Sequence, residues 1–259
     1  MVASTHDGMS GVSVSDTLTM EDPWRWLSAG WRDLWAMPLI SLTYGLGFAL
    51  ISAVLVGGLF VLDLSSLVLA LAGGFMLVGP MLAVGMYEAS RRREAGEPVR
   101  LRDVLLVATR SPSQLAFLGV LLMLVLLVWI RLATLIFALF FGLGGFPPLA
   151  EFVPVLLFTW NGVAFLTIGS AVGGALAVLV FAMSVISVPM LLAEDRDAMT
   201  AVLTSINAVR RNFWPMVLWG WLVGFVTAFG IATLFVGLIV TFPLVGHGTW
   251  HAYRAVVRH

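Results

Sequence analysis

The stretch LAFLGVLLMLVLLVWIRLATLIFALFF, residues 115–141, decides the fold class of this chain. Arg131 is its only charged residue. A helix rises about 1.5 Å per residue, so a run of this length is enough to cross a hydrocarbon core about 30 Å thick. We interpret the stretch as a membrane-spanning helix, and we predict an all-α, polytopic membrane bundle.

The composition of the whole chain supports this interpretation. The 259 residues are 60% hydrophobic and 11% charged, with a mean hydropathy of +1.02. Soluble domains are roughly a quarter charged, so this chain has too little polar surface to cover a globule in water. The net charge of zero argues against nucleic acid as a partner. The absence of cysteine excludes disulfides, thiolate metal sites and thiol catalysis.

The same length argument divides the apolar regions into about six spans. Asp63 separates the first two, the Gly/Pro-rich segment 142–150 follows the third, and Gly230 is the predicted turn between the last two. A short outer segment at 151–160 precedes the fourth span. The predicted spans are 40–62, 65–87, 115–141, 163–191, 213–230 and 232–253.

The arginines predict the orientation of the bundle. Every arginine except Arg131 precedes the first span, follows the last, or lies between spans two and three or four and five. The three opposite connections contain no basic residue, and the positive-inside rule therefore places both termini in the cytoplasm. Residues 1–21 are polar and lack an apolar core, so we predict a disordered cytoplasmic tail. Residues 22–259 are predicted to form a single integral membrane domain.

Each pair of predicted spans follows a short stretch with amphipathic helical spacing, near residues 24–35, 101–108 and 199–213. In the first stretch, one face carries Trp24, Leu27, Trp31, Leu34 and Trp35, and the other carries Arg25, Ser28, Arg32 and Asp33. Such helices typically lie in the plane of the lipid headgroups. We therefore predict three short interfacial amphipathic helices.

Cap and proline positions add to this pattern. Asp22 followed by Pro23 is a favourable helix start, and Asp197 is placed to cap the third interfacial helix. The second span of each pair contains a proline, namely Pro80, Pro189 and Pro243. These features predict a threefold repeat of an interfacial helix plus a membrane hairpin. Chance similarity between hydrophobic helices is the alternative explanation.

Four stretches resemble a known bacterial family of predicted integral membrane proteins, domain of unknown function 2189. They are LVGPMLAVGMYEASRRREAGEPV (77–99), LLVWIRLATLIFALFFG (126–142), FAMSVISVPMLL (181–192) and PLVGHGTWHAYRAVV (243–257). The resemblance covers the chain from about residue 20 to 257. It implies a multi-pass protein of the bacterial inner membrane, and it implies no catalytic residue.

Arg131 is the first candidate site residue. Counted from Leu115 at helical rise, it lies about 24 Å into the core, near the outer edge of the bilayer. An arginine at mid-helix costs roughly 2.5–3.5 kcal/mol, so a compensating partner is expected. We predict an ion pair with Glu151, with Asp63 as the other available acid. An anion, lipid-headgroup or cofactor site is the alternative.

Polar motifs near the predicted cytoplasmic side supply the remaining candidates. His247 and His251 are one helical turn apart and are weak candidates for metal ligands, because no third ligand follows at helical spacing. Arg91, Arg92 and Arg93 are candidate contacts for anionic lipid. The acidic segment EDRD, 194–197, is explained by a solvated turn and a helix cap.

These candidates lead to three function classes. The chain lacks the nucleophile, metal-hydrolase and phosphate-binding motifs of enzymes, so we predict no catalytic site and no cofactor. A non-catalytic accessory, assembly or scaffold component is favoured, with the lipid bilayer and other membrane subunits or a second copy as partners. A small-solute or lipid transporter or channel that uses Arg131 is the alternative.

Overall fold

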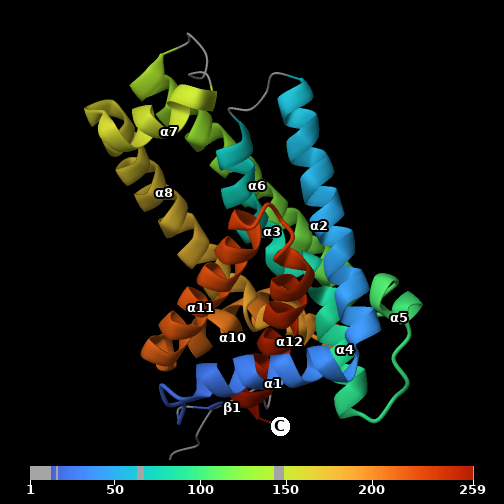
Figure 1. The fold of residues 1–259 in the computed structure, drawn as a ribbon. Helices are drawn as coiled ribbons and strands as arrows, with labels where there is room; N and C mark the ends of the chain where they lie inside the picture. Colours follow the sequence, from blue (N-terminus) through green and yellow to red (C-terminus); the bar gives the residue numbers. More distant parts are fainter. Residues whose placement is uncertain (1–12, 16, 63–66, 143–148, 259) are drawn as a thin grey trace, which may run out of the picture.

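The computed structural model describes residues 13–15, 17–62, 67–142 and 149–258. Within these residues the protein is a helical bundle, and its one pair of strands is two residues long on each side. Figure 1 shows long helices that rise from a common base, formed by α1, α4, α10 and the C-terminal end, towards the opposite end, where α7 lies. The predicted all-α class is confirmed.

The helices have the following bounds. They are α1 (Asp22–Ala36), α2 (Pro38–Val61), α3 (Leu67–Leu82), α4 (Val84–Glu94), α5 (Leu101–Leu105), α6 (Pro112–Phe141), α7 (Leu149–Phe158), α8 (Trp160–Ser184), α9 (Ser187–Ala193), α10 (Ala198–Arg211), α11 (Phe213–Ala232) and α12 (Leu238–Val256). The strands are β1 (Ser13–Val14) and β2 (Val257–Arg258).

Five helical segments among the described residues are long and apolar enough to cross a membrane. They are Pro38–Val61, Ala70–Glu94, Pro112–Phe141, Trp160–Ala193 and Phe213–Ala232. They coincide with the first five predicted spans. The sixth, 232–253, corresponds to α12, which does not meet the same test because His247, Thr249, His251 and Arg254 lower its hydropathy.

The predicted turn at Gly230 is wrong, because α11 continues to Ala232. The turn lies at 233–237, where Leu234 and Phe235 adopt φ values of 53° and 69°. Gly230 has a packing role instead. A Cβ at this position would collide with Oγ1 of Thr241, so the glycine allows α11 and α12 to approach each other closely.

The predicted interfacial stretches form helices of unequal length. The first and third coincide with α1 and α10, but the second, predicted over 101–108, is the five-residue α5. Asp197 caps α10 as predicted, since its Oδ1 accepts a hydrogen bond from the backbone N–H of Thr200 at 2.8 Å. The N-cap of α1 is Glu21 rather than Asp22. Asp22 instead accepts a hydrogen bond from the backbone N–H of Thr19 at 2.6 Å.

The packing of α1 corrects its predicted polar face, because Asp33 on that face is buried. On the predicted apolar face, Trp24, Trp31 and Trp35 are exposed and Leu34 is buried. The reason is the crossing of α1 over α12 at Gly30, where an added Cβ would lie 2.7 Å from the backbone nitrogen of Gly248. The side of α1 that contacts the protein is therefore centred on Gly30, not on the tryptophans.

Helix α12 is the centre of the base. It packs against α1, α2, α4 and α11, and most of its residues are buried. At the side of the base, β1 pairs antiparallel with β2, with Ser13 opposite Arg258 and Val14 opposite Val257. This part of the predicted disordered tail is therefore ordered, because it completes a strand pair with the chain end. Residues 1–12 and 16 of that tail lie outside the described residues.

Candidate functional site

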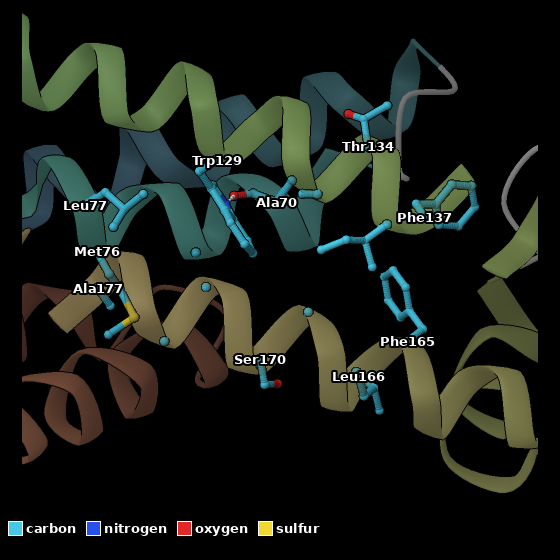
Figure 2. A pocket seen from close by; sticks show the side chains of 16 residues that line it. Ala70, Met76, Leu77, Trp129, Thr134, Phe137, Phe165, Leu166, Ser170 and Ala177 are labelled. Carbon is cyan, nitrogen blue, oxygen red and sulfur yellow. Dashed lines mark hydrogen bonds between the residues drawn. The ribbon is translucent and has the colours of Figure 1, made fainter. Parts of the chain in front are cut away.

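Two cavities lie between the long helices. The first, of about 450 Å³, is enclosed by α3, α6 and α8. Figure 2 shows Trp129 of α6 turned towards α3, where its Nε1 donates to the carbonyl of Ala70 at 2.6 Å. The second, of about 410 Å³, lies between α3, α8, α11 and α12. The walls of both cavities are predominantly apolar, which is typical of sites for apolar ligands.

A different kind of site lies at the base, where α1, α2, α4 and α12 meet. Six hydrogen-bonded side chains gather there, and we call them the polar cluster: Asp33, Ser41, Ser90, Arg93, His247 and His251. Each of the four helices contributes at least one of them. The cluster is therefore a tertiary feature that no single helix forms alone.

Proton accounting fixes the direction of the hydrogen bonds around His247, which is fully buried. Ser90 donates its one hydroxyl proton to Oδ2 of Asp33 at 2.5 Å. His247 Nδ1, 2.7 Å from the same Ser90 oxygen, must then be the donor. In the neutral ring, the proton therefore lies on Nδ1, and Nε2 accepts from the Ser41 hydroxyl at 3.0 Å.

Asp33 is the charged member at the centre of the cluster and is only 2% exposed. Its Oδ2 lies 2.9 Å from Nε2 of His251, and its Oδ1 pairs with the guanidinium of Arg93. Burial alone would raise the pKa of Asp33, but hydrogen bonds from His251 and Ser90 outweigh burial and hold the pKa below its ordinary value. Asp33 is therefore a buried carboxylate kept ionised by its neighbours.

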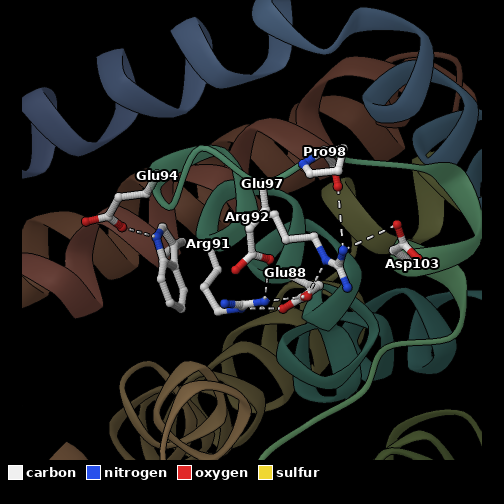
Figure 3. Close-up of polar contacts among 8 residues, drawn as sticks. Glu88, Arg91, Arg92, Glu94, Glu97, Pro98 and Asp103 are labelled. Carbon is white, nitrogen blue, oxygen red and sulfur yellow. Dashed lines mark hydrogen bonds and ion pairs between the residues drawn. The ribbon is translucent and has the colours of Figure 1, made fainter.

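A second buried carboxylate, Glu88, lies on α4 (Figure 3) and is 1% exposed. Arg91 donates to it through Nε at 2.7 Å and Nη2 at 2.9 Å, and Arg92 donates through Nε at 2.6 Å. The two guanidinium groups also approach Glu97 and Asp103, each at 3.4 Å. The three arginines predicted to contact anionic lipid therefore all have carboxylate partners within the protein, since Arg93 pairs with Asp33.

Helix α12 donates three further hydrogen bonds at the base, to two carboxylates. Trp250 Nε1 and Arg254 Nε donate to the carboxylate of Glu94 at 3.0 and 3.1 Å. The Tyr253 hydroxyl donates to Glu194 at 2.5 Å. The acidic segment 194–197 therefore does more than form a solvated turn, because Glu194 joins α12 to the end of α9.

The two candidate metal ligands belong to the polar cluster. Both ring nitrogens of His247 are engaged in hydrogen bonds, and His251 is bound to Asp33. A metal bound by His247 would have to displace one of those bonds. Across the described parts of the chain, no group of three or more His, Asp or Glu side chains is placed to hold a metal ion.

The predicted ion pair of Arg131 falls on side chains that the structure does not describe. Arg131 itself is exposed on α6 and is not among the residues that line either cavity. Asp63 lies outside the described residues, and Glu151 lies in the backbone of α7, but its side chain is not described. The proposed ion pair therefore stays a prediction.

The sequence reasoning missed Asp33, Ser41, Glu88 and Ser90 as site residues. One signal for two of them was present in the segment MYEAS, 86–90, where Glu88 and Ser90 follow directly on an apolar run. A charged residue at the end of a span is commonly attributed to the interface. The burial of these side chains depends on α1 and α12, which a local pattern in α4 does not indicate.

Long apolar helices joined at one end by buried polar contacts define a multi-pass integral membrane protein. In a comparison with family models, residues 67–193 match the family described as predicted integral membrane protein (DUF2189). The resemblance is confirmed for three of the four stretches that suggested it, and the fourth, 243–257, lies beyond the match. No curated protein and no solved structure gave a significant match.

Proposed function

We propose that the protein is a non-catalytic accessory, assembly or scaffold component of the bacterial inner membrane. The observation that carries the proposal is the way in which its ionisable side chains are used. Asp33 and Glu88, both buried, are neutralised by arginines of α4, and His247 is hydrogen-bonded on both nitrogens. These groups stabilise the contacts between helices at the base, which supports a structural role and argues against an enzyme.

The exposed surface of the long helices supports the same role. Large apolar side chains are exposed along the outer faces of α2 and α6, among them Leu50, Val54, Phe117 and Leu139. Such a surface suits contact with lipid and with the helices of other membrane proteins. A second copy of the chain or another membrane subunit is the partner that we propose.

We also propose six crossings with both termini in the cytoplasm. The pairing of β1 with β2 brings the two chain ends together, and two ends on one side require an even number of crossings. Helix α12 is the natural sixth, because it returns from the turn at 233–237 to the base. Arg91, Arg92 and Arg93 lie at that same base, which agrees with the positive-inside rule.

The order of the elements supports a threefold repeat. Each of α1, α5 and α10 is followed by a first long helix, namely α2, α6 and α11. A second descending segment then returns to the base, formed by α3–α4, by α8–α9 and by α12. The short α7 is an addition to the second unit. Interfacial helices at α1 and α10 are part of the proposal.

The transporter alternative receives less support. Arg131 would have to face a pathway, but it lies on the exposed side of α6, whereas Trp129, Ala133 and Phe137 face the first cavity. An arginine in that position is better suited to the lipid boundary, where its long side chain can reach the headgroups.

Native mass measurement after gentle detergent extraction tests the accessory role. We expect a particle heavier than the 28.0 kDa chain by the mass of a second copy or of another membrane protein. A parallel extraction of the Glu88→Gln protein is the control for loss of stability. This change weakens the base and leaves the exposed apolar faces of α2 and α6 unaltered, so it separates a loss of assembly caused by unfolding from one caused by a lost interface. A chain that migrates alone across a range of mild detergents contradicts the proposal.

A further inference from the structure

We propose that the two cavities together form a groove that binds one acyl chain of a membrane phospholipid lengthwise along α8. We call it the acyl groove and define it by the residues common to both cavities, Met76, Gly174 and Ala177. The inference goes beyond the accessory role and does not depend on it, because it requires only that the helices lie in a membrane.

The shape of the acyl groove is long and narrow. Along α8 its lining runs from Phe165, in the first cavity, to Ser184, in the second. At helical rise this distance is roughly 28 Å, which is close to the thickness of the hydrocarbon core. The walls are the spans α3, α6, α8 and α11 together with the proposed span α12, so the space lies where lipid tails are the surrounding solvent.

The packing of the surrounding spans argues against a helix of a partner protein as the occupant. Helix α3 contacts α6 and α8, and α6 also contacts α8. A partner helix about 10 Å wide would have to separate these spans along its length. A flexible chain of methylene groups can instead occupy both cavities in succession.

Glycines keep the space open. A Cβ added at Gly169 or Gly174 on α8, or at Gly79 on α3, would have nothing within 4 Å. All three residues line the acyl groove. Glycine in a helix interior costs about 0.5–1 kcal/mol relative to alanine. At these glycines the helices lack side chains that could pack against neighbouring spans, and no other protein atom fills the space. A thin apolar ligand in this space would supply the missing van der Waals contacts.

A polar group marks the end of the acyl groove nearest the base. Trp219 lines the second cavity and is fully buried, and its Nε1 has no hydrogen-bond partner among the described residues. A buried N–H donor without a partner is unfavourable. The ester carbonyl of a phospholipid would accept this proton. Val209 also lines this end, and the next residue, Arg210, is an exposed cation suited to a phosphate.

Photo-crosslinking in vesicles tests the proposal. The full-length protein is reconstituted in phosphatidylethanolamine and phosphatidylglycerol vesicles that contain a trace of phosphatidylglycerol with a diazirine in one acyl chain. Peptide mapping is expected to find a saturable crosslink at Met76 and at 174–177. We expect Gly174→Leu, which places a side chain in the shared part of the groove, to lower this crosslink at least tenfold.

The control is Gly58→Leu on α2, where an added Cβ also has nothing within 4 Å but the residue lines neither cavity. It should leave the crosslink at 174–177 unchanged. If Gly174→Leu fails to fold, Gly169→Leu takes its place, because it fills the first cavity alone. Crosslinks spread evenly over α2, α6 and α8, or an unchanged yield in the folded groove variants, would overturn the proposal.

Discussion

Asp33 accepts hydrogen bonds from side chains of two neighbouring helices although almost none of its surface is exposed. Asparagine has one oxygen and one N–H₂ group in place of the two carboxylate oxygens. Its N–H₂ group would therefore face another donor, which is Arg93 in one orientation and Ser90 with His251 in the other. Hydrogen bonds to a charged group contribute about 1.5–3 kcal/mol. We expect Asp33→Asn to lower the free energy of unfolding by that amount, measured by thermal unfolding in detergent.

The effect of Asp33→Asn should depend on pH in a defined way. The pKa of Asp33 in the folded protein is lower than its ordinary value. The carboxylate therefore stabilises the fold fully above a pH of about 4, and its contribution is lost as the pH falls through the lower, folded pKa. The difference between wild type and variant should thus shrink in acid. Asp195→Asn, at an exposed residue that accepts only a long, 3.4 Å hydrogen bond from Ser111, should change stability by less than about 0.5 kcal/mol, and an equal loss in both variants would contradict the assignment.

The residue scale also shows why the sequence did not reveal the polar cluster. In α1 the tryptophans define the apolar stripe, and in a water-soluble protein that stripe would face the core. In a membrane protein an apolar side chain is stable on the outside as well, so apolar periodicity does not identify the buried face. Asp33 was assigned to a polar face for this reason, although it faces α12.

At the scale of the elements, the position of α12 depends on close helix crossings. At Gly45 on α2 an added Cβ would collide with the carbonyl oxygen of Ile239, whereas at Gly47, two residues further on, it would meet nothing within 4 Å. We expect Gly45→Ala to destabilise the protein by about 1–3 kcal/mol, because α2 must move away from α12.

Gly47→Ala is the matched control in the same helix. It should be neutral or slightly stabilising, because alanine is more favourable than glycine in the interior of a helix. Thermal unfolding of both proteins in one detergent gives the comparison. Equal effects at the two positions would show that α2 does not depend on this crossing.

Hydropathy predicted the elements well where a helix meets lipid on most sides. Helices α2 and α6 were predicted within a few residues, because their length and composition follow directly from the bilayer. Hydropathy was less accurate for the bounds of helices that pack mainly against other helices. The turn at 233–237 was misplaced because Gly230 served close packing, and α5 was shorter than its amphipathic pattern indicated.

At the scale of the whole molecule, the proposed topology can be measured directly because the chain contains no cysteine. Leu62→Cys adds a thiol at the end of α2, and Leu106→Cys adds one after α5, at positions that are 68% and 81% exposed. In intact spheroplasts, a membrane-impermeant maleimide should label the first protein, and the second only after permeabilisation. The reverse pattern, or equal labelling, would refute cytoplasmic termini.

The central place of α12 has a consequence for the biosynthesis of the protein. It leaves the ribosome well after α1, α2 and α4, yet it supplies His247 and His251 to side chains on those helices. Until it arrives, the hydroxyl of Ser41 and part of the Asp33 carboxylate lack their final partners. The base therefore matures only once α12 has been synthesised, and a product terminated before α12 exposes an unfinished base that proteolytic quality control can recognise.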